Sequence, residues 1–456
     1  MIDYDKLAKY SAPVPRYTSY PTAPEFQESW TADNLRTAIT RSNESGRDLS
    51  IYAHLPFCRS ACYFCGCNAI YTNREELKDR YIDYLAREIE IACKTLDRER
   101  KVTQIHFGGG TPTFFNAAQL EKIIGLIRSA FPNIAKEVEF SVEIDPRFFT
   151  EEQMDVFAEN KVNRVSIGVQ DFNPKVQKAV HRIQPFSIAQ NAVARARAYG
   201  TKSVNIDLIY GLPHQNAVGF KETLKMTLDL APDRVALFSY AHVPWLKKTM
   251  RKLDETALPS AVEKLKMMRL AIETFSEAGL EMIGMDHFAK PSDELNIALK
   301  EGKLRRNFQG YATRGQCDLV GFGVTSISEG EDFYSQNFRD LGDYEKAIDS
   351  ALPPILRGIG LNDDDRLRKR VIFSLMGSFA LDFAAIEKEF DVNFESYFAS
   401  DIAALAPLEA DGLVSIANRR VEVSKTGRLL IRNIAMNFDK YLKKTGSLER
   451  RFSKSV

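Results

Sequence analysis

Apolar runs and amphipathic stretches alternate over the first half of the chain, and no other feature of the sequence limits the fold as strongly. Six short runs rich in β-branched and aromatic residues indicate strands, at 49–55, 102–107, 138–144, 164–170, 203–209 and 234–240. After the first run, Leu77, Tyr81, Leu85 and Ile89 recur at helical spacing and mark the buried face of an amphipathic helix. The alternation predicts parallel strands joined by crossover helices.

The number of these strand-and-helix units favours an incomplete barrel. Six units are fewer than the eight of a closed (β/α)8 barrel, so we expect an α/β fold with an open or partial (β/α)6-type barrel. Its working face is expected at the C-terminal ends of the strands. A long helix is predicted over 261–278, and the apolar segments at 282–285 and 319–326 are expected to extend the sheet.

The composition of the chain changes at both ends of this region, which predicts three segments. Residues 1–48 form an arm rich in Pro and Tyr with a polar helix, and residues 49–362 form the barrel with its extension. Residues 363–456 contain helices and a short β-ribbon, which suggests a small, mostly helical, winged-helix-like domain. A solvated wing explains the basic residues of this domain better than a nucleic-acid surface does. These residues are Arg419, Arg420, Lys425, Arg428 and Arg432.

The overall charge gives no reason to expect a polyanionic partner. Lys and Arg number 62 against 61 Asp and Glu, a formal net charge of +1, so nucleic acid is not an expected ligand. No uncharged apolar run reaches the roughly 18 to 20 residues of a membrane helix, and residues 1–16 lack the pattern of a signal peptide. We therefore expect a cytoplasmic protein without a membrane partner, and we expect a monomer.

Four of the six cysteines fall in one short segment, Cys58-Arg-Ser-Ala-Cys62-Tyr-Phe-Cys65-Gly-Cys67, directly after the first expected strand. In a reducing compartment, cysteines this close are more often metal or cluster ligands than disulfide partners. A structural zinc site would draw a second cysteine or histidine pair from another segment, and the sequence has no pair with suitable spacing. Three thiolates on one tight loop instead suit three irons of a [4Fe–4S] cube, whose fourth iron stays open to another ligand.

Polar residues follow the ends of several expected strands, where a barrel places its catalytic loops. The turn 108–111 is Gly-Gly-Gly-Thr, and residues without side chains let backbone amides approach a charged ligand closely. Glu143 and Asp145 end the third strand, Gln170 ends the fourth, and Asp207 lies on the fifth. A capping or sheet-edge role is about as frequent for any one of these residues, but their occurrence together favours a site.

The cysteine spacing at the end of a first barrel strand resembles the radical S-adenosylmethionine (SAM) superfamily. This resemblance implies a partial radical SAM barrel in which the open iron chelates the amino and carboxylate groups of SAM. It also implies that the reduced cluster cleaves SAM to methionine and a 5′-deoxyadenosyl radical, which takes a hydrogen atom from the substrate. The protein then has to hold the radical against one C–H bond and exclude water and oxygen.

Further motifs resemble one family within this superfamily, the oxygen-independent coproporphyrinogen III oxidases. The matching segments are 16–22, 52–58, 62–67, 108–112, 168–172, 205–213, 284–288 and 307–311. The resemblance runs from the arm to the C-terminus, although the block 245–252 departs from the family pattern. It implies oxidative decarboxylation of two propionate side chains of coproporphyrinogen III to vinyl groups, giving protoporphyrinogen IX in haem biosynthesis.

The family resemblance also implies roles for single residues. It implies Cys58, Cys62 and Cys65 as cluster ligands, and Cys67 as a catalytic residue that does not ligate iron. The positions implied for cluster-bound SAM are Tyr52, Gly109, Glu143 and Ile327, of which Tyr52 and Glu143 are also expected to be catalytic. The positions implied for a second SAM molecule are Phe64, Gly110, Thr111, Gln170, Arg182, Asp207 and Ala241.

The reaction sets two further requirements. The substrate carries four carboxylates, so donors are needed, and Arg16, Tyr17 and Tyr20 on the arm are candidates. The substrate radical must lose one more electron before carbon dioxide departs, so the enzyme needs a final electron acceptor besides the donor that reduces the cluster. The sequence identifies neither of them.

Three rival functions remain open at this point. A related haem-binding chaperone would bind porphyrin and cluster without decarboxylation, and a second kind of radical SAM enzyme would open or methylate haem. The arm segment 16–22 argues against both, and Cys67 also argues against the chaperone. A radical enzyme that modifies nucleic acid is the third, motivated by the winged domain, and a salt-dependent interaction with RNA or DNA would be its sign.

Overall fold

The structure is a computed structural model that describes residues 2–313, 315, 317–442 and 452–454. Its contacts divide the chain into two compact units. The sheet unit comprises residues 27–267 and 316–360, and the composite unit comprises residues 1–26, 268–315 and 361–456. These bounds differ from the three segments expected from the sequence, 1–48, 49–362 and 363–456, which remain a prediction of domain organisation.

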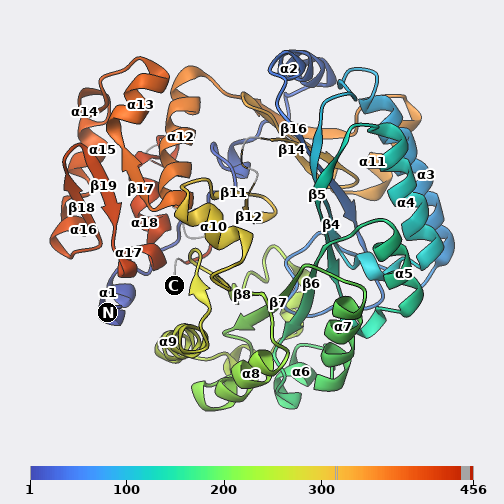
Figure 1. The fold of residues 1–456 in the computed structure, drawn as a ribbon, viewed down its shortest axis with the longest axis horizontal. Coiled ribbons are helices and arrows are strands. Elements are labelled where there is room, and N and C mark those ends of the chain that lie inside the picture. Colours follow the sequence, from blue (N-terminus) through green and yellow to red (C-terminus); the bar gives the residue numbers. More distant parts are fainter. Residues whose placement is uncertain (1, 314, 316, 443–451, 455–456) are drawn as a thin grey trace. The chain divides into compact units, whose positions relative to one another are not determined.

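The sheet unit is built on one continuous mixed sheet (Figure 1). Its strands follow the order β16-β15-β14-β13-β1-β4-β5-β6-β7-β8. Every pair of neighbouring strands from β13 to β8 is parallel, as the crossover pattern predicts. The strands of the parallel part are β1 (Leu49–Leu55), β4 (Val102–Gly109), β5 (Ile134–Ile144), β6 (Arg164–Gln170), β7 (Ser203–Tyr210), β8 (Arg234–Ser239) and β13 (Asp318–Phe322). The six expected strands are thus confirmed, and so is the partial α/β barrel.

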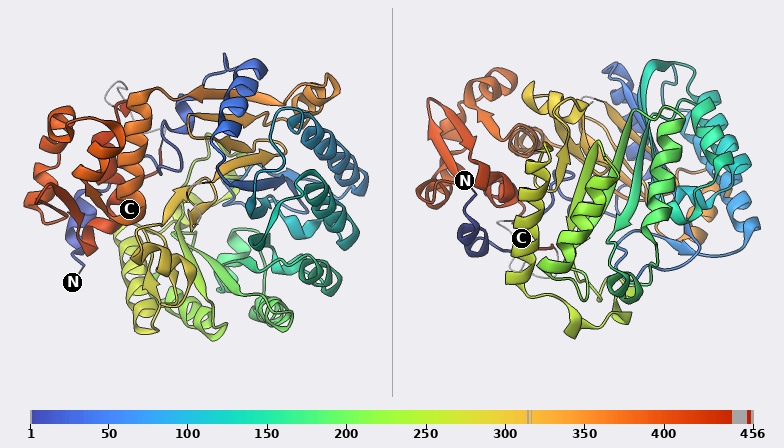
Figure 2. Two further views of the ribbon diagram at one scale, coloured as in Figure 1. Left: turned by 45° about the horizontal axis from the view of Figure 1, so that its top comes forward. Right: turned by 60° about the horizontal axis from the view of Figure 1, so that its bottom comes forward.

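Helices connect the parallel strands and lie along one face of the sheet, as the views in Figures 1 and 2 agree. Neighbouring helices contact one another in chain order, α3 with α4, α4 with α5, and α5 with α7. Asn116 and Thr150 begin α4 and α5 through capping boxes with Gln119 and Gln153. The helices are α2 (Ala32–Glu44), α3 (Glu75–Ala92), α4 (Ala117–Ala130), α5 (Glu151–Glu159), α6 (Pro174–Ala179), α7 (Phe186–Ala198), α8 (Ala217–Asp229) and α11 (Leu341–Asp349), and α9 (Ala261–Glu277) runs from this unit into the composite unit.

Short elements complete the sheet unit. Beyond β13 the sheet continues through antiparallel pairs, so the apolar segment near residue 319 does extend it, as expected. The additional strands are β2 (Phe57–Cys58), β3 (Ile70–Tyr71), β14 (Ile327–Glu329), β15 (Phe333–Asn337) and β16 (Ile355–Gly360). The 3-10 helices are η2 (Pro112–Phe114), η3 (Pro146–Phe148), η4 (Lys248–Lys252) and η5 (Glu255–Ala257).

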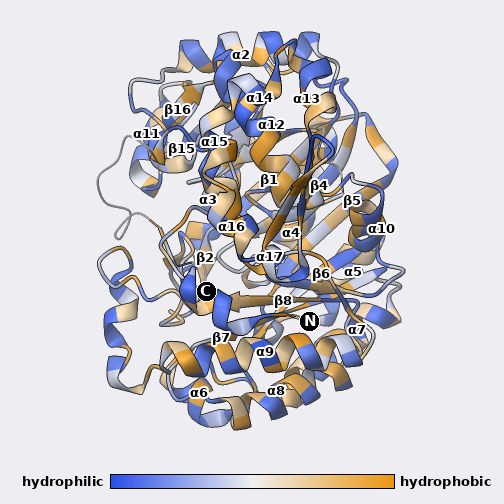
Figure 3. Cartoon of the chain, turned by 90° about the vertical axis from the view of Figure 1, so that its left-hand side faces the viewer, coloured by the Kyte–Doolittle hydropathy of each residue, from blue (hydrophilic) through white to orange (hydrophobic). Residues whose placement is uncertain are grey.

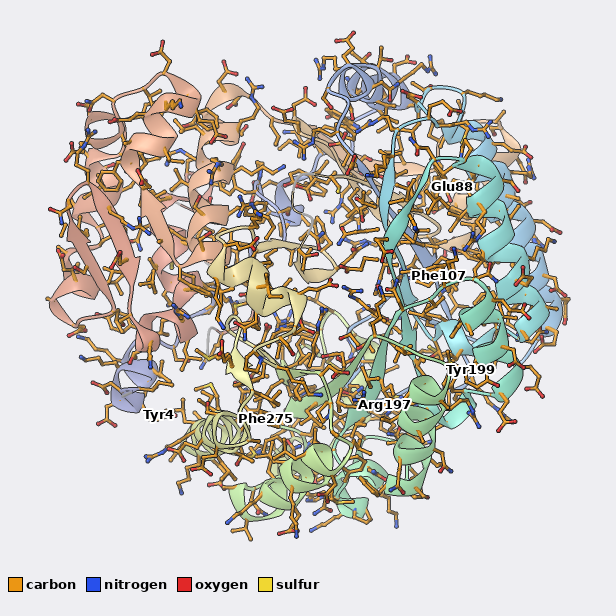
Figure 4. All side chains as sticks on the ribbon, viewed as in Figure 1. Tyr4, Glu88, Phe107, Arg197, Tyr199 and Phe275 are labelled. Atoms are coloured by element: carbon orange, nitrogen blue, oxygen red, sulfur yellow. The ribbon has the colours of Figure 1, made fainter. Side chains whose placement is uncertain are left out.

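The core of the sheet unit lies between the strands and the covering helices. Phe107 on β4 and Phe140 on β5 are both buried and meet edge to face, with ring centroids 5.2 Å apart. Figure 4 shows Phe107 among these packed side chains, and Figure 3 shows hydrophobic and hydrophilic residues alternating along α8, as expected for a helix buried on one side only.

The carboxyl group of Glu88 on α3 is buried in this core (Figure 4). It accepts hydrogen bonds from the backbone N–H of Gly323 at 2.7 Å, from Asn337 Nδ2 at 2.6 Å and from the Tyr344 hydroxyl at 2.7 Å. Burial raises the pKa of Glu88 to about 7. Glu88 thus fixes the turn that leads from β13 to Ile327.

The composite unit joins both ends of the chain to an internal segment. Its first two parts contain α1 (Tyr4–Lys9), η1 (Ala23–Glu25), β9 (Glu281–Met282), β10 (His287–Ala289), α10 (Glu294–Lys300), β11 (Arg305–Asn307) and β12 (Gly310–Ala312). Its C-terminal part contains α12 (Asp363–Ser378), β17 (Ala380–Asp382), α13 (Phe383–Phe390), α14 (Phe394–Tyr397), α15 (Ala399–Ala403), α16 (Ala406–Ala410), β18 (Val414–Ala417), β19 (Arg420–Val423), α17 (Lys425–Leu429), α18 (Ile431–Ala435) and η6 (Met436–Phe438).

The C-terminal part has the helices and small β-ribbon that the sequence predicts. Its sheet has the order β17-β19-β18, and the β18–β19 hairpin turns through Asn418 and Arg419, which have φ of 51° and 58° as a type I′ turn requires. The arginines do not form an open basic surface. Arg419 pairs with Glu387 at 2.6 Å, Arg420 pairs with Glu422, and the guanidinium of Arg428 lies over the ring of Phe379.

Arg432 of this part is buried and binds both ends of the chain. Its guanidinium donates to the carbonyl oxygens of Val14, Pro15, Ser453 and Lys454. Burial lowers the pKa of Arg432 to about 9. Arg432, which the sequence places among the basic residues of the wing, is therefore an internal clamp, a buried side chain that holds the two ends of the chain together.

Two of the tyrosines expected to bind substrate have other partners. The Tyr17 hydroxyl donates to Asp439 Oδ2 at 3.1 Å, and the Tyr20 hydroxyl accepts a hydrogen bond from the backbone N–H of Lys440 at 3.2 Å. Both rings are buried, so their role is to hold the arm within the composite unit.

In the part of the chain that the structure describes, none of the helices has the length and apolar character of a membrane span.

Candidate functional site

The cysteine loop, residues 58–67, leaves the C-terminal end of β1 and is fixed by contacts with two other loops of the sheet unit. The backbone N–H of Tyr63 donates to the Val180 carbonyl at 3.0 Å, and the Tyr63 ring stacks on His181 with centroids 4.9 Å apart. Lys247 Nζ donates to the Cys67 carbonyl at 2.8 Å. The loop therefore has a defined position at the edge of the sheet where the polar strand ends meet.

The three cysteines expected as ligands have donors around them. Cys58 Sγ lies 3.2 Å from the Thr111 hydroxyl, and burial raises the pKa of Cys58 to about 12. Cys62 is buried, and Arg182 Nη1 and Arg147 Nη2 donate to its sulfur at 3.6 and 3.8 Å. A hydrogen bond from the Cys67 thiol lowers the pKa of Cys65 below its ordinary value.

Three cysteines on one loop can supply three of the four ligand positions of an iron–sulfur cluster. In the described part of the chain, no three His, Cys, Asp or Glu side chains gather around one point as a lone metal ion would require. A [4Fe–4S] cube takes each thiolate at its own corner, which leaves one iron for another ligand when three cysteines bind.

A buried ion-pair network lies behind the cysteine loop. Asp145 Oδ2 accepts hydrogen bonds from Arg182 Nη1 at 2.8 Å and from Arg147 Nη2 at 2.6 Å. Burial alone would raise the pKa of Asp145, but the two guanidinium groups lower it below its ordinary value. Arg182 Nη2 also donates to the Gly168 carbonyl at 2.7 Å. Arg182 is thus held by fixed acceptors, with Cys62 beside it.

The glycines of the turn after β4 allow that turn to pack directly on the end of β1. A Cβ on Gly109, whose φ is 111°, would lie 2.6 Å from the His54 ring. A Cβ on Gly110 would lie 2.5 Å from the backbone of Pro56, so no side chain fits there. The Gly110 N–H donates to Leu55 and the Thr111 N–H to Phe57. These contacts place Thr111 next to Cys58.

An aromatic and acidic group lies beside this turn. The Tyr52 ring stacks on His106 with centroids 5.7 Å apart, and its hydroxyl lies 3.0 Å from His54 Nδ1. Glu143 Oε1 lies 3.4 Å from His106 Nε2, and Glu143 Oε2 accepts the Gly109 N–H at 3.3 Å. Although burial acts to raise the pKa of Glu143, His106 and the Gly109 N–H lower it below its ordinary value. Glu143 is therefore a carboxylate at neutral pH.

A second polar group lies on the next two strands. Gln170 has a φ of 68°, and both its amide and Arg182 lie so close to Gly168 that a Cβ there would be within 3.0 Å of each. On β7, Asp207 accepts hydrogen bonds from Ser166 Oγ at 2.9 Å and from Asn205 Nδ2 at 2.7 Å. The two carboxylates Glu143 and Asp207 thus stand on different strands, each with its own hydrogen-bond donors.

The remaining residues implied by the family resemblance lie around these groups. Phe64 packs against the apolar cluster that contains Val176, Tyr240 and Met250, and Ala241 follows Tyr240 just after β8. Ile327 begins β14, where its backbone would touch any Cβ placed on Gly321. Gly321 is the register partner of Tyr52, so Ile327 belongs to the neighbourhood of Tyr52.

Three residues of this site were not predicted from the sequence. His106 contacts both Tyr52 and Glu143, and Arg147 contacts both Asp145 and Cys62. The sequence contains only a weak indication that His106 and Arg147 belong to the site. His106 faces the same side of β4 as Gly108, and Arg147 follows Asp145 in the turn Asp-Pro-Arg. Lys247 lies in the block that departs from the family pattern.

Comparison with protein families gives two matches. Residues 52–227 match the model of the radical SAM superfamily, and residues 361–430 match the HemN C-terminal domain. The first match contains the cysteine loop and both polar groups described above.

Comparison with known proteins gives relatives over the full length. The chain is 51% identical to an oxygen-independent coproporphyrinogen III oxidase of Helicobacter pylori, over 100% of this chain and 99% of that protein. It is 44% identical to the enzyme of the same name from Escherichia coli, again over 100% and 99%. The solved structure of the Escherichia coli coproporphyrinogen III oxidase, HemN, described as a radical SAM enzyme, superposes with a TM-score of 0.92 at 43% identity, covering 97% of this chain and 99% of that one.

Proposed function

The chain belongs to the radical SAM superfamily and, within it, to the oxygen-independent coproporphyrinogen III oxidases, and we propose on this basis that it converts coproporphyrinogen III to protoporphyrinogen IX. The reaction is the oxidative decarboxylation of two propionate side chains to vinyl groups. The observation that carries the proposal is the position of the cysteine loop: Cys58 contacts the glycine turn that also donates to Glu143. The cluster ligands and the polar strand ends therefore belong to one site.

The cofactors of this family are a [4Fe–4S] cluster and SAM, which together supply the radical that removes a hydrogen atom from the substrate. Cys58, Cys62 and Cys65 hold the cluster, supported by Thr111 and Arg182 at two of the three sulfurs. Cys67 is exposed and separated from Cys65 by one glycine, so it stays outside the cluster and acts on the substrate side.

One group of residues binds the SAM molecule on the cluster. Glu143 is ionised and accepts the ammonium group, the Gly109 backbone lies beside it, and Tyr52 and Ile327 form the adjoining wall. The stacked His106 holds Tyr52 in place and hydrogen-bonds Glu143, which makes it a positioning residue.

A second group binds a second SAM molecule. Arg182 offers a cation for its carboxylate, and Asp207 and Gln170 offer polar partners on the neighbouring strands. Gly110 and Thr111 contribute backbone at the turn, while Phe64 and Ala241 contribute apolar surface. The support for this division is that the Glu143 group and the Arg182 group have separate hydrogen-bond partners.

The protein also needs an electron donor for the cluster and a final acceptor for the electron that the substrate loses. We propose that it works as a monomer in the cytoplasm, without a membrane or nucleic-acid partner. Three arginines of the C-terminal ribbon region are paired or buried, which supports the absence of a nucleic-acid partner from this proposal.

An anaerobic turnover assay tests this function. Protein with reconstituted cluster, SAM and a chemical reductant is incubated with coproporphyrinogen III, and porphyrins are separated after oxidation. We expect protoporphyrin together with an intermediate that has lost one carboxylate. Tight haem binding without turnover would instead identify a haem-binding chaperone, and conversion of added haem would identify an enzyme that opens or methylates it.

A further inference from the structure

Three segments of the sheet unit together form a surface with an unusual charge. They are the cysteine loop and its continuation 58–71, the segment 172–184 that contains α6, and the segment 241–252 that contains η4. None of the three contains an Asp or a Glu, although the whole chain is nearly balanced with 62 basic and 61 acidic residues. We name this surface the basic face. Its cations are Arg59, Lys175, Lys178, Lys247, Lys248, Arg251 and Lys252.

Direct contacts join the three segments, so their cations share one surface. His181 Nδ1 lies 2.9 Å from the Ala61 carbonyl, and Lys252 Nζ lies 5.1 Å from the centre of the Tyr63 ring. Beneath them, Val176, Val180 and Met250 belong to one buried apolar cluster, against which Tyr63 and Phe64 pack. The block 245–252, which departs from the family pattern, is thus packed on the cysteine loop.

The basic face also exposes large apolar side chains. Ile183 is 66% exposed, Trp245 is 51% exposed and Leu246 is 65% exposed. Exposed apolar side chains together with polar or charged neighbours are typical of a surface that binds another protein. Within the part of the chain that the structure describes, none of the seven cations forms an ion pair with a carboxylate. Their charge is therefore available to a partner.

The position of the face indicates which partner it fits. Lys247 binds the Cys67 carbonyl and Lys252 lies over Tyr63, so the face begins at the loop that carries the cluster ligands. Electron transfer to a cluster requires the carrier to approach this loop closely. We propose that the basic face is the docking surface for a small acidic one-electron carrier protein, a proposal that rests on the function proposed above. The carrier is oxidised by one electron and the cluster is reduced by one, and no bond forms or breaks.

Electrostatics gives this proposal a definite signature. Association of oppositely charged surfaces weakens with ionic strength, because salt screens the charges over about 10 Å at 0.1 M. The test variant is the triple substitution Lys175→Glu, Lys178→Glu and Lys248→Glu, which are all exposed and outside the candidate site. The matched control is Lys101→Glu, Lys136→Glu and Lys202→Glu, which makes the same charge change near the N-terminal ends of β4, β5 and β7.

The experiment measures binding and reduction separately. Binding of a purified acidic flavodoxin is measured by calorimetry at about 50 and about 300 mM salt, and cluster reduction is followed by loss of visible absorbance. We expect the test variant to raise the Kd at low salt by about tenfold or more and to slow carrier-driven reduction by a similar factor. The control should behave as the unaltered protein. A parallel assay uses dithionite-reduced methyl viologen, a cation that the substitutions do not repel.

The carrier assay and the viologen assay together distinguish the possible results. Viologen-driven turnover and the KM for coproporphyrinogen III should be unchanged in the test variant. An unchanged Kd for the carrier would overturn the proposal, and so would a raised KM in the viologen assay, which would assign the face to the substrate. If viologen drove no turnover even in the unaltered protein, the proposed function would fail, while the Kd would still decide on the docking surface.

Discussion

Arg182 Nη1 lies 2.8 Å from Asp145 Oδ2 and 3.6 Å from Cys62 Sγ, so one guanidinium group touches both a buried carboxylate and a cluster ligand. The residue that we assign to the second SAM molecule is thereby also part of the support of the cluster loop. The two roles of Arg182 can be separated by experiment. When Arg182 is replaced, Arg147 still binds Asp145 and still donates to Cys62, so the cluster loop keeps part of its support.

We predict that Arg182→Ala lowers turnover by about 100-fold or more, because a misplaced bound molecule loses its reactive geometry. Equilibrium dialysis should show one SAM bound per chain in this variant and two in the unaltered protein. Glu143→Gln should instead weaken the SAM molecule on the cluster. Arg195→Ala, which removes a guanidinium from the outer helix α7, is the control. Two bound SAM molecules and normal turnover in Arg182→Ala would contradict the assignment.

Anaerobically purified protein should contain about four irons per chain, the content of one cube. Replacing Cys58, Cys62 or Cys65 by Ser should abolish the brown chromophore, since each removes one of three ligands. Cys93→Ser, at the end of α3 and outside the loop, should keep it. Iron content and the visible spectrum check this prediction, and a cluster that survived all three loop substitutions would refute the ligand set.

Cys67→Ser should keep a full cluster and the change that SAM causes in its electron paramagnetic resonance spectrum. It should nevertheless lose much of the decarboxylation activity. The physical reason is that one glycine between Cys65 and Cys67 limits how far their sulfurs can separate, so both cannot reach corners of one cube. Loss of iron on this substitution would make Cys67 a fourth ligand and the protein an electron carrier.

Gly110→Ala should damage the site although it adds only a methyl group. Its Cβ would lie 2.5 Å from the backbone of Pro56, which cannot move without displacing β1, and such overpacking costs roughly 1–3 kcal/mol. Urea unfolding and SAM binding should both weaken. Gly66→Ala is the matched control in the cysteine loop, because nothing lies within 4 Å of its Cβ. Equal behaviour of the two variants would contradict the close packing described here.

Glu88 should make stability depend on pH. Its pKa is raised from 4.5 to about 7, so its protonated form is favoured in the fold. The stability it contributes is fully present below about pH 4.5 and is lost as the pH rises to about 7, a change of roughly 3 kcal/mol. Glu88→Gln should remove this part of the difference in unfolding free energy between pH 5 and 7.5, measured with urea. The exposed Glu90→Gln on the same helix should leave the difference unchanged.

The sequence predicted strands well where both faces are buried and less well elsewhere. The expected strand at 138–144 begins at Ile134 in the structure, because Ile134 pairs with Val102 although Lys136 and Glu137 next to it are exposed. Such a polar strand end has no apolar pattern by which to recognise it. Its pairing with β4 depends on a contact between distant segments.

The same reason explains which site residues could be predicted. Cys58, Glu143 and Asp207 lie in motifs or at strand ends, so local pattern was sufficient to select them. Arg147 reaches Cys62, and Lys247 reaches the Cys67 carbonyl, only because of the tertiary fold. For Arg432 the local pattern was misleading. Its basic segment predicted a solvated side chain, but the side chain is buried against backbone carbonyls.

The clamp formed by Arg432 has a consequence for how the protein is made. The ribosome synthesises the arm long before Arg432, so the carbonyl groups of Val14 and Pro15 lack this partner until residue 432 has been made. Strand β13 likewise reaches its place beside β1 only after most of the chain has been synthesised. A nascent chain that stalls before Leu361 therefore presents an arm without the contacts of Arg432, and chain termini that are not tied down are preferred sites of proteolysis.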